Sequence, residues 1–255
     1  MSKTYYFRDS LIQIEIIPKA TKHKTFLYLA TPLEQNYYSK ENMESFEIWK
    51  PLEGDVEGVR KTFKHRMQKL YDGWKDEFDS QWDKNSFLFV LKKNGEYIAT
   101  CRIIIKRYHN IIFQVPMENA SIQSYDLSEY FDICAEGGMV SFKDLKSFRK
   151  LMYCVASWAY ENEVDYLFTC YDICNTLIRR LYVDTLNFEK VENVQLIYGG
   201  FSSKKYKKEV KWQVVRSDKE HGRSTMDKLT DESDFTYETG KYPRLNDWIK
   251  ERKTD

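Results

Sequence analysis

Two glycines lie inside an apolar stretch, residues 131–142, whose pattern predicts a β-strand. Gly137 and Gly138 in that position indicate a β-bulge, or a point where another group approaches the backbone closely. A helix is predicted from about residue 145, with basic side chains around its start at Lys143, Lys146, Arg149 and Lys150. Because the first N–H groups of a helix attract anions, this stretch has the chemistry to hold one phosphate group.

Other motifs with well-defined chemistry are missing from the sequence. It holds no GxSxG nucleophile motif, no GxxxxGK[ST] phosphate loop and no GxGxxG dinucleotide motif. The four histidines are scattered without metal-ligand spacing and the five cysteines include no CxxC pair, so we expect no metal site.

A basic run, residues 204–208, reads Lys-Lys-Tyr-Lys-Lys. Such a run can dock an acidic carrier protein or a nucleic acid. More often, a run of this kind is a solvated loop between strands. The net charge of the whole chain is only +1, so nucleic acid is not expected as a partner on charge alone.

The elements that must position these residues are strands and helices, which alternate along the sequence. The Asn94-Gly95 turn predicts a hairpin, and Asp55 is placed to cap a helix. Strands are predicted at 11–17, 25–30, 46–51, 86–91, 97–105, 131–142, 164–171, 194–198 and 209–216, and helices at about 56–73, 145–162, 175–184 and 245–252. This order predicts an α/β fold with a mixed sheet.

The composition is that of a folded protein with a large core. Of 255 residues, 42% are hydrophobic and 16% aromatic, whereas only 10 are Gly and 5 are Pro. We expect an N-terminal extension over residues 1–44, a main domain over 45–216, and a polar C-terminal extension with a short helix over 217–255. With no membrane span and no apolar leader run, we expect a soluble cytoplasmic protein.

Particular residues in this order resemble the GNAT superfamily of N-acyltransferases. Residues 46–55 are similar to its opening strand and helix start. Asn175, with Tyr182 seven residues later and then Asn187-Phe188, resembles its motif of an Asn, a Tyr and a Gly-Phe pair. Here Asn187 replaces the Gly, and one extra residue separates Tyr182 from Phe188.

One branch of that superfamily is more similar than the acetyl-transferring majority. Residues 63–74, 101–104, Glu136 and 151–162 resemble acyl-homoserine-lactone synthases and the related N-acyl amino acid synthases in order and spacing. The resemblance implies a mostly antiparallel central sheet with a bulged and splayed middle, flanked by helices. It covers about residues 46–215.

The resemblance implies a role for each candidate residue. Glu136 would accept the amine proton and Tyr182 would protonate the leaving thiolate. The competing interpretations are a solvated carboxylate or a partner for Arg102 in the case of Glu136, and an ordinary core or surface tyrosine in the case of Tyr182. The implied donor-binding positions are Gly138, Met139, Val140, Lys146, Ser147, Arg149 and Asn175. Asn175 could equally be a plain N-cap. The implied acceptor-binding positions are Arg102, Asp79 and Trp82, with Arg102 ordered through Asp79 or Asp83 or held only in a surface salt bridge.

Two departures from the family pattern shape the expected substrates. The turn at 140–150 holds no glycine, which suits the phosphopantetheine of an acyl carrier protein at least as well as a nucleotide cofactor. Met139 stands where the lactone synthases carry an Arg, so an acceptor other than the lactone precursor is expected.

The sequence therefore predicts an N-acyltransferase. It would move an acyl group, expected to be fatty, from an acyl carrier protein or coenzyme A thioester to an amine of a small molecule or peptide, with no permanently bound cofactor and no metal. The alternatives are an acetyl-coenzyme-A-dependent acetyltransferase and a catalytically silent GNAT-like binding module.

Overall fold

The computed structural model describes residues 2–7, 10–18, 26–32, 44–74, 80–130, 132–230 and 235–252. It divides the chain into two units, residues 1–43 and 44–255. In the first unit the strands β1 (Ser2–Phe7), β2 (Ser10–Pro18) and β3 (Phe26–Pro32) form an antiparallel sheet in the order β1-β2-β3.

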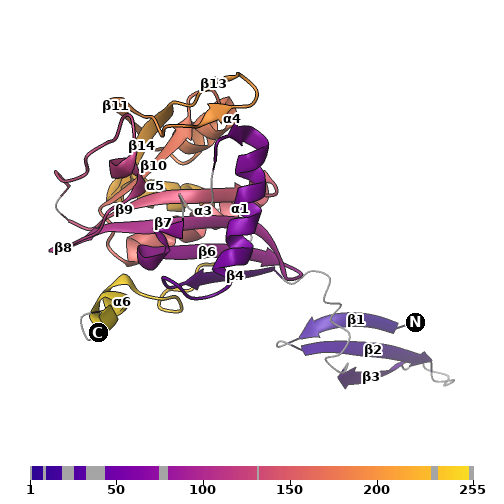
Figure 1. Cartoon of the computed structure of the whole chain (residues 1–255). Helices are drawn as coiled ribbons and strands as arrows, with labels where there is room; N and C mark the ends of the chain where they lie inside the picture. The colour runs from indigo at the N-terminus through magenta and orange to yellow at the C-terminus, as the bar shows by residue number, and fades with distance from the viewer. Residues whose placement is uncertain are drawn as a thin grey trace. The chain divides into compact units, whose positions relative to one another are not determined.

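A sheet of eight strands forms the centre of the second unit (Figure 1). Its order is β11-β14-β10-β9-β7-β6-β4, with β8 paired to β7. The strands are β4 (Glu44–Trp49), β6 (Ser86–Lys93), β7 (Glu96–Tyr108), β8 (Ile111–Ile112), β9 (Cys134–Phe142), β10 (Tyr166–Asp172), β11 (Glu189–Leu196) and β14 (Trp212–Asp218). Among the described strands of this sheet, β9 and β10 pair in parallel and the other neighbours pair antiparallel. The expected mixed, mostly antiparallel sheet is confirmed.

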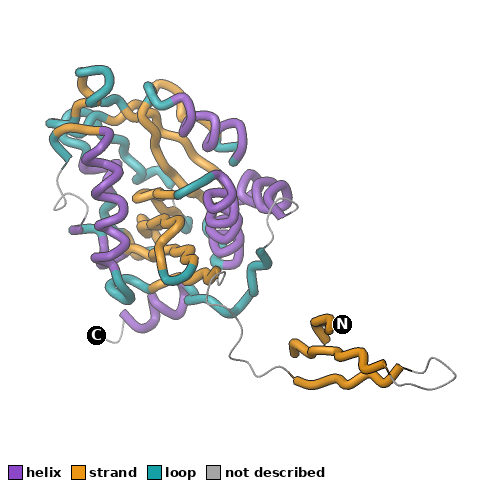
Figure 2. Tube along the Cα trace, turned by 90° about the vertical axis from the view of Figure 1, so that its right-hand side faces the viewer, coloured by secondary structure: helices purple, strands orange, loops and turns teal. Residues whose placement is uncertain are grey.

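Helices cover both faces of this sheet (Figure 2). Helix α1 (Val56–Leu70) buries Val59 and Phe63 in one core, which also holds Ile104 of β7. Helix α3 (Leu145–Glu161) buries its apolar stripe in a second core, which holds Ile103 and Ile105. Because alternate residues of a strand point to opposite faces, α1 and α3 lie on opposite sides of β7.

The segment after β14 belongs to the second unit and adds to the core on the α3 face. Helix α5 (Lys219–Thr230) packs against α3, and α6 (Leu245–Arg252) lies where a short helix is predicted. Trp248 of α6 packs on Phe87 with ring centroids 5.4 Å apart. The Trp158 indole of α3 donates a hydrogen bond of 2.8 Å to the Pro243 carbonyl. Helix α5 is not among the helices that the sequence predicts.

Short elements complete the second unit. The two-residue strand β5 (Tyr71–Asp72) follows α1 directly, and it pairs with β12 (Ser202–Ser203), which pairs with β13 (Lys208–Glu209). One-turn 3-10 helices lie at Asp83–Asn85 and Pro116–Asn119. Helix α4 (Thr176–Arg179) continues into a π-helical turn, Arg180–Thr185.

None of the helices in the described ranges is long and apolar enough to cross a membrane.

Candidate active site

The parallel strands β9 and β10 are paired over only part of their length. Cys134, Ala135 and Glu136 pair with Tyr166, Leu167 and Phe168. Beyond that point the two strands diverge, and the Thr169 hydroxyl donates a hydrogen bond of 3.0 Å to the Gly137 carbonyl at the fork. The sheet is therefore splayed at its middle, as the sequence resemblance implies.

A β-bulge lies in β9 just past the two glycines. Thr100 of β7 pairs with Ser141 and Arg102 pairs with Gly138, so Met139 and Val140 together oppose the single residue between them. Met139 takes a left-handed backbone conformation with a φ of 49°. The bulge that Gly137 and Gly138 indicate in the sequence is confirmed, but neither glycine takes a positive φ. They leave space instead, since a Cβ on Gly138 would meet nothing closer than Arg102 at 3.9 Å.

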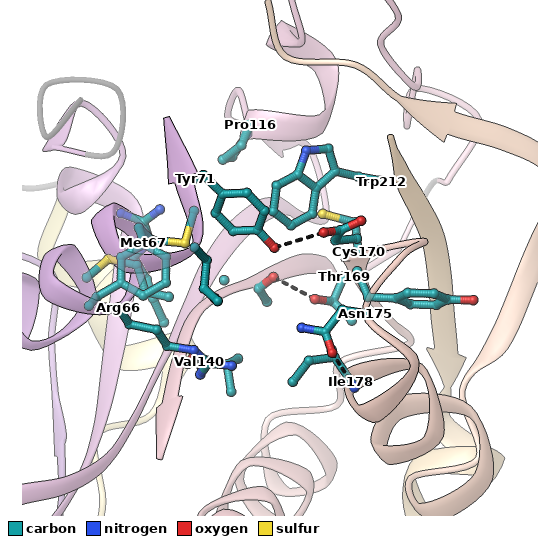
Figure 3. Close-up of a pocket in the computed structure, with 18 of the residues that line it drawn as sticks. Arg66, Met67, Tyr71, Pro116, Val140, Thr169, Cys170, Asn175, Ile178 and Trp212 are labelled. Carbon is teal, nitrogen blue, oxygen red and sulfur yellow. Dashed lines mark hydrogen bonds between the residues drawn. The ribbon is translucent and has the colours of Figure 1, made fainter. Parts of the chain in front are cut away.

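A cavity of about 160 Å³ opens where the strands diverge (Figure 3). Its walls come from α1, β9, β10, α4, β14 and the segment after β11. Most of its lining is apolar or aromatic: Phe63, Met67, Leu70, Trp74, Met139, Val140, Phe142, Phe148, Ile178, Phe201 and Trp212. Polar side chains reach it at Arg66, Arg102, Glu136, Thr169, Asp172, Asn175 and Tyr182, among others.

Glu136 is the last paired residue of β9 before the splay. Its side chain lines the cavity but is only 4% exposed. The Met117 backbone N–H donates a hydrogen bond of 2.9 Å to Glu136 Oε2. The one-turn helix Pro116–Asn119 thus fixes the orientation of this carboxylate, which is the arrangement that a positioned base requires.

Arg102 lies beside Glu136 on the α1 face of the sheet. It is buried, lines the cavity, and places Nη1 3.5 Å from Asp83 Oδ1. Asp83 also pairs with Arg60 of α1. Of the two carboxylates that the sequence offered for Arg102, Asp83 makes the contact, and Asp79 lies outside the described residues. The pair is buried, so the surface salt bridge is the wrong alternative.

Trp82, the third predicted acceptor residue, is packed in the core on the α1 face and does not line the cavity. Its carbonyl accepts a hydrogen bond from the Asn85 backbone N–H at 3.2 Å.

Tyr182 lies in the π-helical turn and reaches the cavity from the α3 side. Burial raises the pKa of this phenol, and a hydrogen bond with Thr169 works in the opposite direction. A tyrosine with a raised pKa stays protonated at neutral pH and keeps its O–H as a donor. A protonated phenol at this position can donate a hydrogen bond into the cavity.

The π turn explains the irregular spacing after Tyr182. The Leu186 N–H bonds to the Leu181 carbonyl at 2.9 Å, which closes a turn one residue wider than an α-helical turn. Asn187 has a φ of 56°, a left-handed conformation that Asn tolerates better than most residues. The extra residue and the Gly-to-Asn replacement seen in the sequence are therefore absorbed by the wide turn and by Asn187.

Asn175 caps α4 and also lines the cavity. Its Oδ1 accepts a hydrogen bond of 3.2 Å from the Ile178 N–H, and its own N–H donates to the Asp172 carbonyl at 2.8 Å. The N-cap alternative is confirmed, and Figure 3 shows the side chain at the cavity wall.

The start of α3 differs from the sequence expectation of free N–H donors. Asp144 caps this helix, accepting hydrogen bonds from the Ser147 N–H at 2.8 Å and the Ser147 hydroxyl at 2.9 Å. These bonds lower the pKa of the Asp144 carboxyl. A carboxylate already occupies the Ser147 donors, and neither Lys146, Ser147 nor Arg149 lines the cavity.

Lys150 is also not available as a phosphate ligand. It is buried, and its Nζ lies 2.5 Å from Glu44 Oε2.

Other cavity residues carry polar contacts that the sequence did not single out. The Tyr71 hydroxyl donates a hydrogen bond of 3.2 Å to Asp172 Oδ2, and burial together with this carboxylate raises the pKa of Tyr71. Arg66 Nη1 donates to the Val140 carbonyl at 2.7 Å, on the bulge. The one available signal was Asp172 itself, a charged residue directly after an apolar strand.

In the described parts of the chain, no group of three or more His, Cys, Asp or Glu side chains could hold a metal ion.

Solved structures that share this arrangement of elements include acyl-transferring enzymes. FeeM, an N-acyl amino acid synthase from uncultured soil microbes, has a TM-score of 0.50 at 15% identity over 73% of this chain and 96% of its own. BjaI, a CoA-dependent acyl-homoserine lactone synthase in a structure with MTA, has a TM-score of 0.53 at 12% identity over 82% of this chain and 99% of its own. No protein-family model and no curated protein matches the sequence. The chain has the GNAT fold, and its expected likeness to the N-acyl amino acid and acyl-homoserine-lactone synthases is confirmed at the level of that fold.

Proposed function

We propose that this protein is an N-acyltransferase that moves an acyl group from a thioester to an amine. The observation that carries the proposal is the cavity between the diverging ends of β9 and β10. It brings Glu136 from one face of the sheet and Tyr182 from the other to a single space beside the β9 bulge.

The reaction needs one base, one acid and a held carbonyl group. Glu136 accepts a proton from the ammonium form of the acceptor, and the neutral nitrogen attacks the thioester carbonyl carbon. The C–N bond forms, the C–S bond breaks, and the sulfur leaves with the electron pair of that bond. Tyr182 protonates this thiolate. The nitrogen then loses its second proton, which restores the Tyr182 phenol, and Glu136 releases the first proton to solvent, so the products are an amide and a free thiol.

The lining of the cavity supports a fatty acyl group over an acetyl group. Its wall on the α1 side is built from large side chains, including Phe63, Met67 and Trp74. Burying an apolar chain there releases about 25 cal/mol for each Å² removed from water, a gain that a two-carbon group hardly uses. The thioester donor is an acyl carrier protein or coenzyme A, and the acceptor is a small molecule or a peptide.

The test is thiol release from a panel of acyl thioesters, of two to sixteen carbons, mixed with a panel of amines. Release with the longer chains, lost in Glu136→Gln and reduced in Tyr182→Phe, is the expected result. Glu192→Gln and Tyr160→Phe are matched controls, because both residues lie outside the cavity lining. No release above background with any acyl length contradicts the proposal. If neither site variant changes the effect that the protein has in the cell, a catalytically silent binding module is favoured.

A further inference from the structure

Resting on the proposed function, we infer that the surface around the cavity mouth docks an acidic carrier protein, which delivers the acyl thioester. The surface has two parts. The basic turn is Lys204–Lys208, and the apolar rim is Leu70, Ile173 and Leu177.

The apolar rim lies next to the cavity lining along the chain. Leu70 lines the cavity and is 37% exposed. Ile173 and Leu177 belong to the β10–α4 turn and to α4, on either side of the cavity-lining Asn175, and are 39% and 54% exposed. Exposed apolar side chains next to a ligand cavity can contribute to a protein-binding surface.

The basic turn is fixed to the wall of the same cavity. Its Lys204 N–H donates to the Leu70 carbonyl at 3.0 Å, and Lys204 Nζ donates to the Gln68 carbonyl at 2.6 Å. Strand β12, which precedes the turn, pairs Ser203 with the cavity residue Tyr71. The turn is also linked toward α4, because the Ile173 N–H donates to the Lys211 carbonyl at 3.1 Å. Figure 1 shows β13, α4 and the end of α1 together at one end of the unit.

The turn itself is a preformed structure. The Tyr206 N–H donates to Ser203 Oγ at 3.3 Å and the Lys207 N–H to the Ser203 carbonyl at 2.8 Å. Lys205 and Lys208 place Nζ 5.0 and 5.8 Å from the centre of the Tyr206 ring, which is 44% exposed. A rigid turn loses little conformational freedom when a partner binds.

The charge of the turn is largely uncompensated. Lys204 lies 3.6 Å from Asp72, whereas in the described parts of the chain no carboxylate forms an ion pair with Lys205, Lys207 or Lys208. Three ammonium groups that have no carboxylate partner in the described parts of the chain, next to an apolar rim, complement a partner that is acidic and also presents apolar side chains. A nucleic acid would contact the lysine charges but would not bury the exposed apolar side chains of Ile173 and Leu177.

The start of α3 gives a second reason to favour a protein-borne donor. The Asp144 carboxylate accepts the Ser147 donors, and Lys146, Ser147 and Arg149 lie outside the cavity lining, so this helix start is not arranged to hold the pyrophosphate of a nucleotide cofactor in the cavity. A carrier protein needs no such grip, because its binding energy comes from its own surface.

The experiment compares two donors of the same acyl group, a holo acyl carrier protein and the short thioester acyl-N-acetylcysteamine. The variant combines Lys205→Glu, Lys207→Glu and Lys208→Glu. Its matched control, Lys190→Glu with Lys219→Glu and Arg223→Glu, makes the same charge change at exposed residues of β11 and α5. Direct binding of the non-acylated carrier protein is measured by fluorescence anisotropy in parallel.

The expected result is a rise of about tenfold or more in the KM for the acylated carrier, with kcat/KM for the short thioester unchanged, because rim charges act on association with a charged partner. In the unaltered protein, raising the salt from about 50 to about 500 mM should weaken carrier use and spare the short thioester.

Equal loss with both donors, or no change with either, overturns the docking surface. So does loss of double-stranded DNA binding in the variant while carrier binding persists. If no thioester is used at all, the proposed function fails. The anisotropy measurement still tests the docking surface in that case. Carrier binding that is weakened in the basic-turn variant but not in the control variant supports the surface, and equal binding by the two variants contradicts it.

Discussion

The two halves of the β9–β10 pair contrast within a few residues. In the paired half, Cys134–Glu136 lies against Tyr166–Phe168, and Phe168 is fully buried among Tyr125, Tyr130 and Tyr166. In the splayed half, Met139 and Val140 form a bulge and Asp172 faces a cavity. The first half holds the sheet together, and the second leaves a space that the fold does not fill.

This contrast separates the residues expected to determine stability from those expected to determine substrate use. Backbone pairing between β9 and β10 ends at Glu136 and Phe168. Changes before this point should therefore affect the free energy of unfolding, and changes after it should affect substrate use.

Phe168→Ala should give the largest effect on stability. Removing a fully buried ring from the paired half should cost about 3–5 kcal/mol in the free energy of unfolding. The matched change Phe142→Ala, at a half-buried cavity residue of the splayed half, should cost about 2 kcal/mol or less while it raises the KM for long-chain thioesters. Urea unfolding of both variants measures the difference, and equal losses would mean that the two halves are packed alike.

Glu136→Gln should give the largest effect on activity. We expect a fall of about 10²–10³ in kcat/KM, since the amide cannot take up the ammonium proton. The midpoint of thermal unfolding should change little, because an amide oxygen still accepts the Met117 N–H bond. A variant that keeps its activity at pH 7 and above would remove Glu136 from the mechanism.

Tyr182→Phe should have a smaller effect on activity. A hydrogen bond to a charged group contributes about 1.5–3 kcal/mol, so a loss of about ten- to a hundredfold in kcat is expected. Thioesters with a more acidic leaving thiol should lose less, since their thiolate needs less help. Equal losses across a series of leaving thiols would assign Tyr182 a packing role.

Asp144→Ala should give the smallest change, at the helix start that follows β9. Loss of this N-cap should cost about 0.5–2 kcal/mol at neutral pH. The pKa of Asp144 is lowered in the folded protein, so its contribution is present above the unfolded pKa of about 3.9 and is lost as the pH falls through the folded value. Unfolding curves of the two proteins should therefore differ at pH 7 and converge at about pH 2–3. A difference that persists at low pH would contradict the cap.

Local signals predicted most of the fold. The hairpin of β6 and β7 follows from Asn94-Gly95, whose φ angles of 55° and 83° are those of a two-residue turn. Helices α1 and α3 follow from apolar residues at spacings of three and four. Helix α5 was not predicted because its sequence is mostly polar, and within this helix only Thr225 and Leu229 are buried.

Long-range contacts account for most of what the sequence could not predict. Helix α1 ends at Leu70, short of the predicted residue 73, where β5 pairs with β12 and a Cβ on Gly73 would lie 1.8 Å from the Gly200 carbonyl. The Tyr71–Asp172 bond likewise joins residues about a hundred positions apart. The N-cap role of Asp144 could have been predicted from the sequence, because an Asp three residues before Ser147 at a helix start is an N-cap pattern.

The π turn after α4 also bears on how the chain can vary in length. The wider hydrogen-bonded ring of this turn accommodates one extra residue. The Phe188 N–H still donates a hydrogen bond of 2.9 Å to the Tyr182 carbonyl. Deleting a residue from this turn would convert it to an ordinary α-helical turn. The segment between Tyr182 and Phe188 is therefore where we expect a one-residue insertion or deletion to leave the phenol at the cavity.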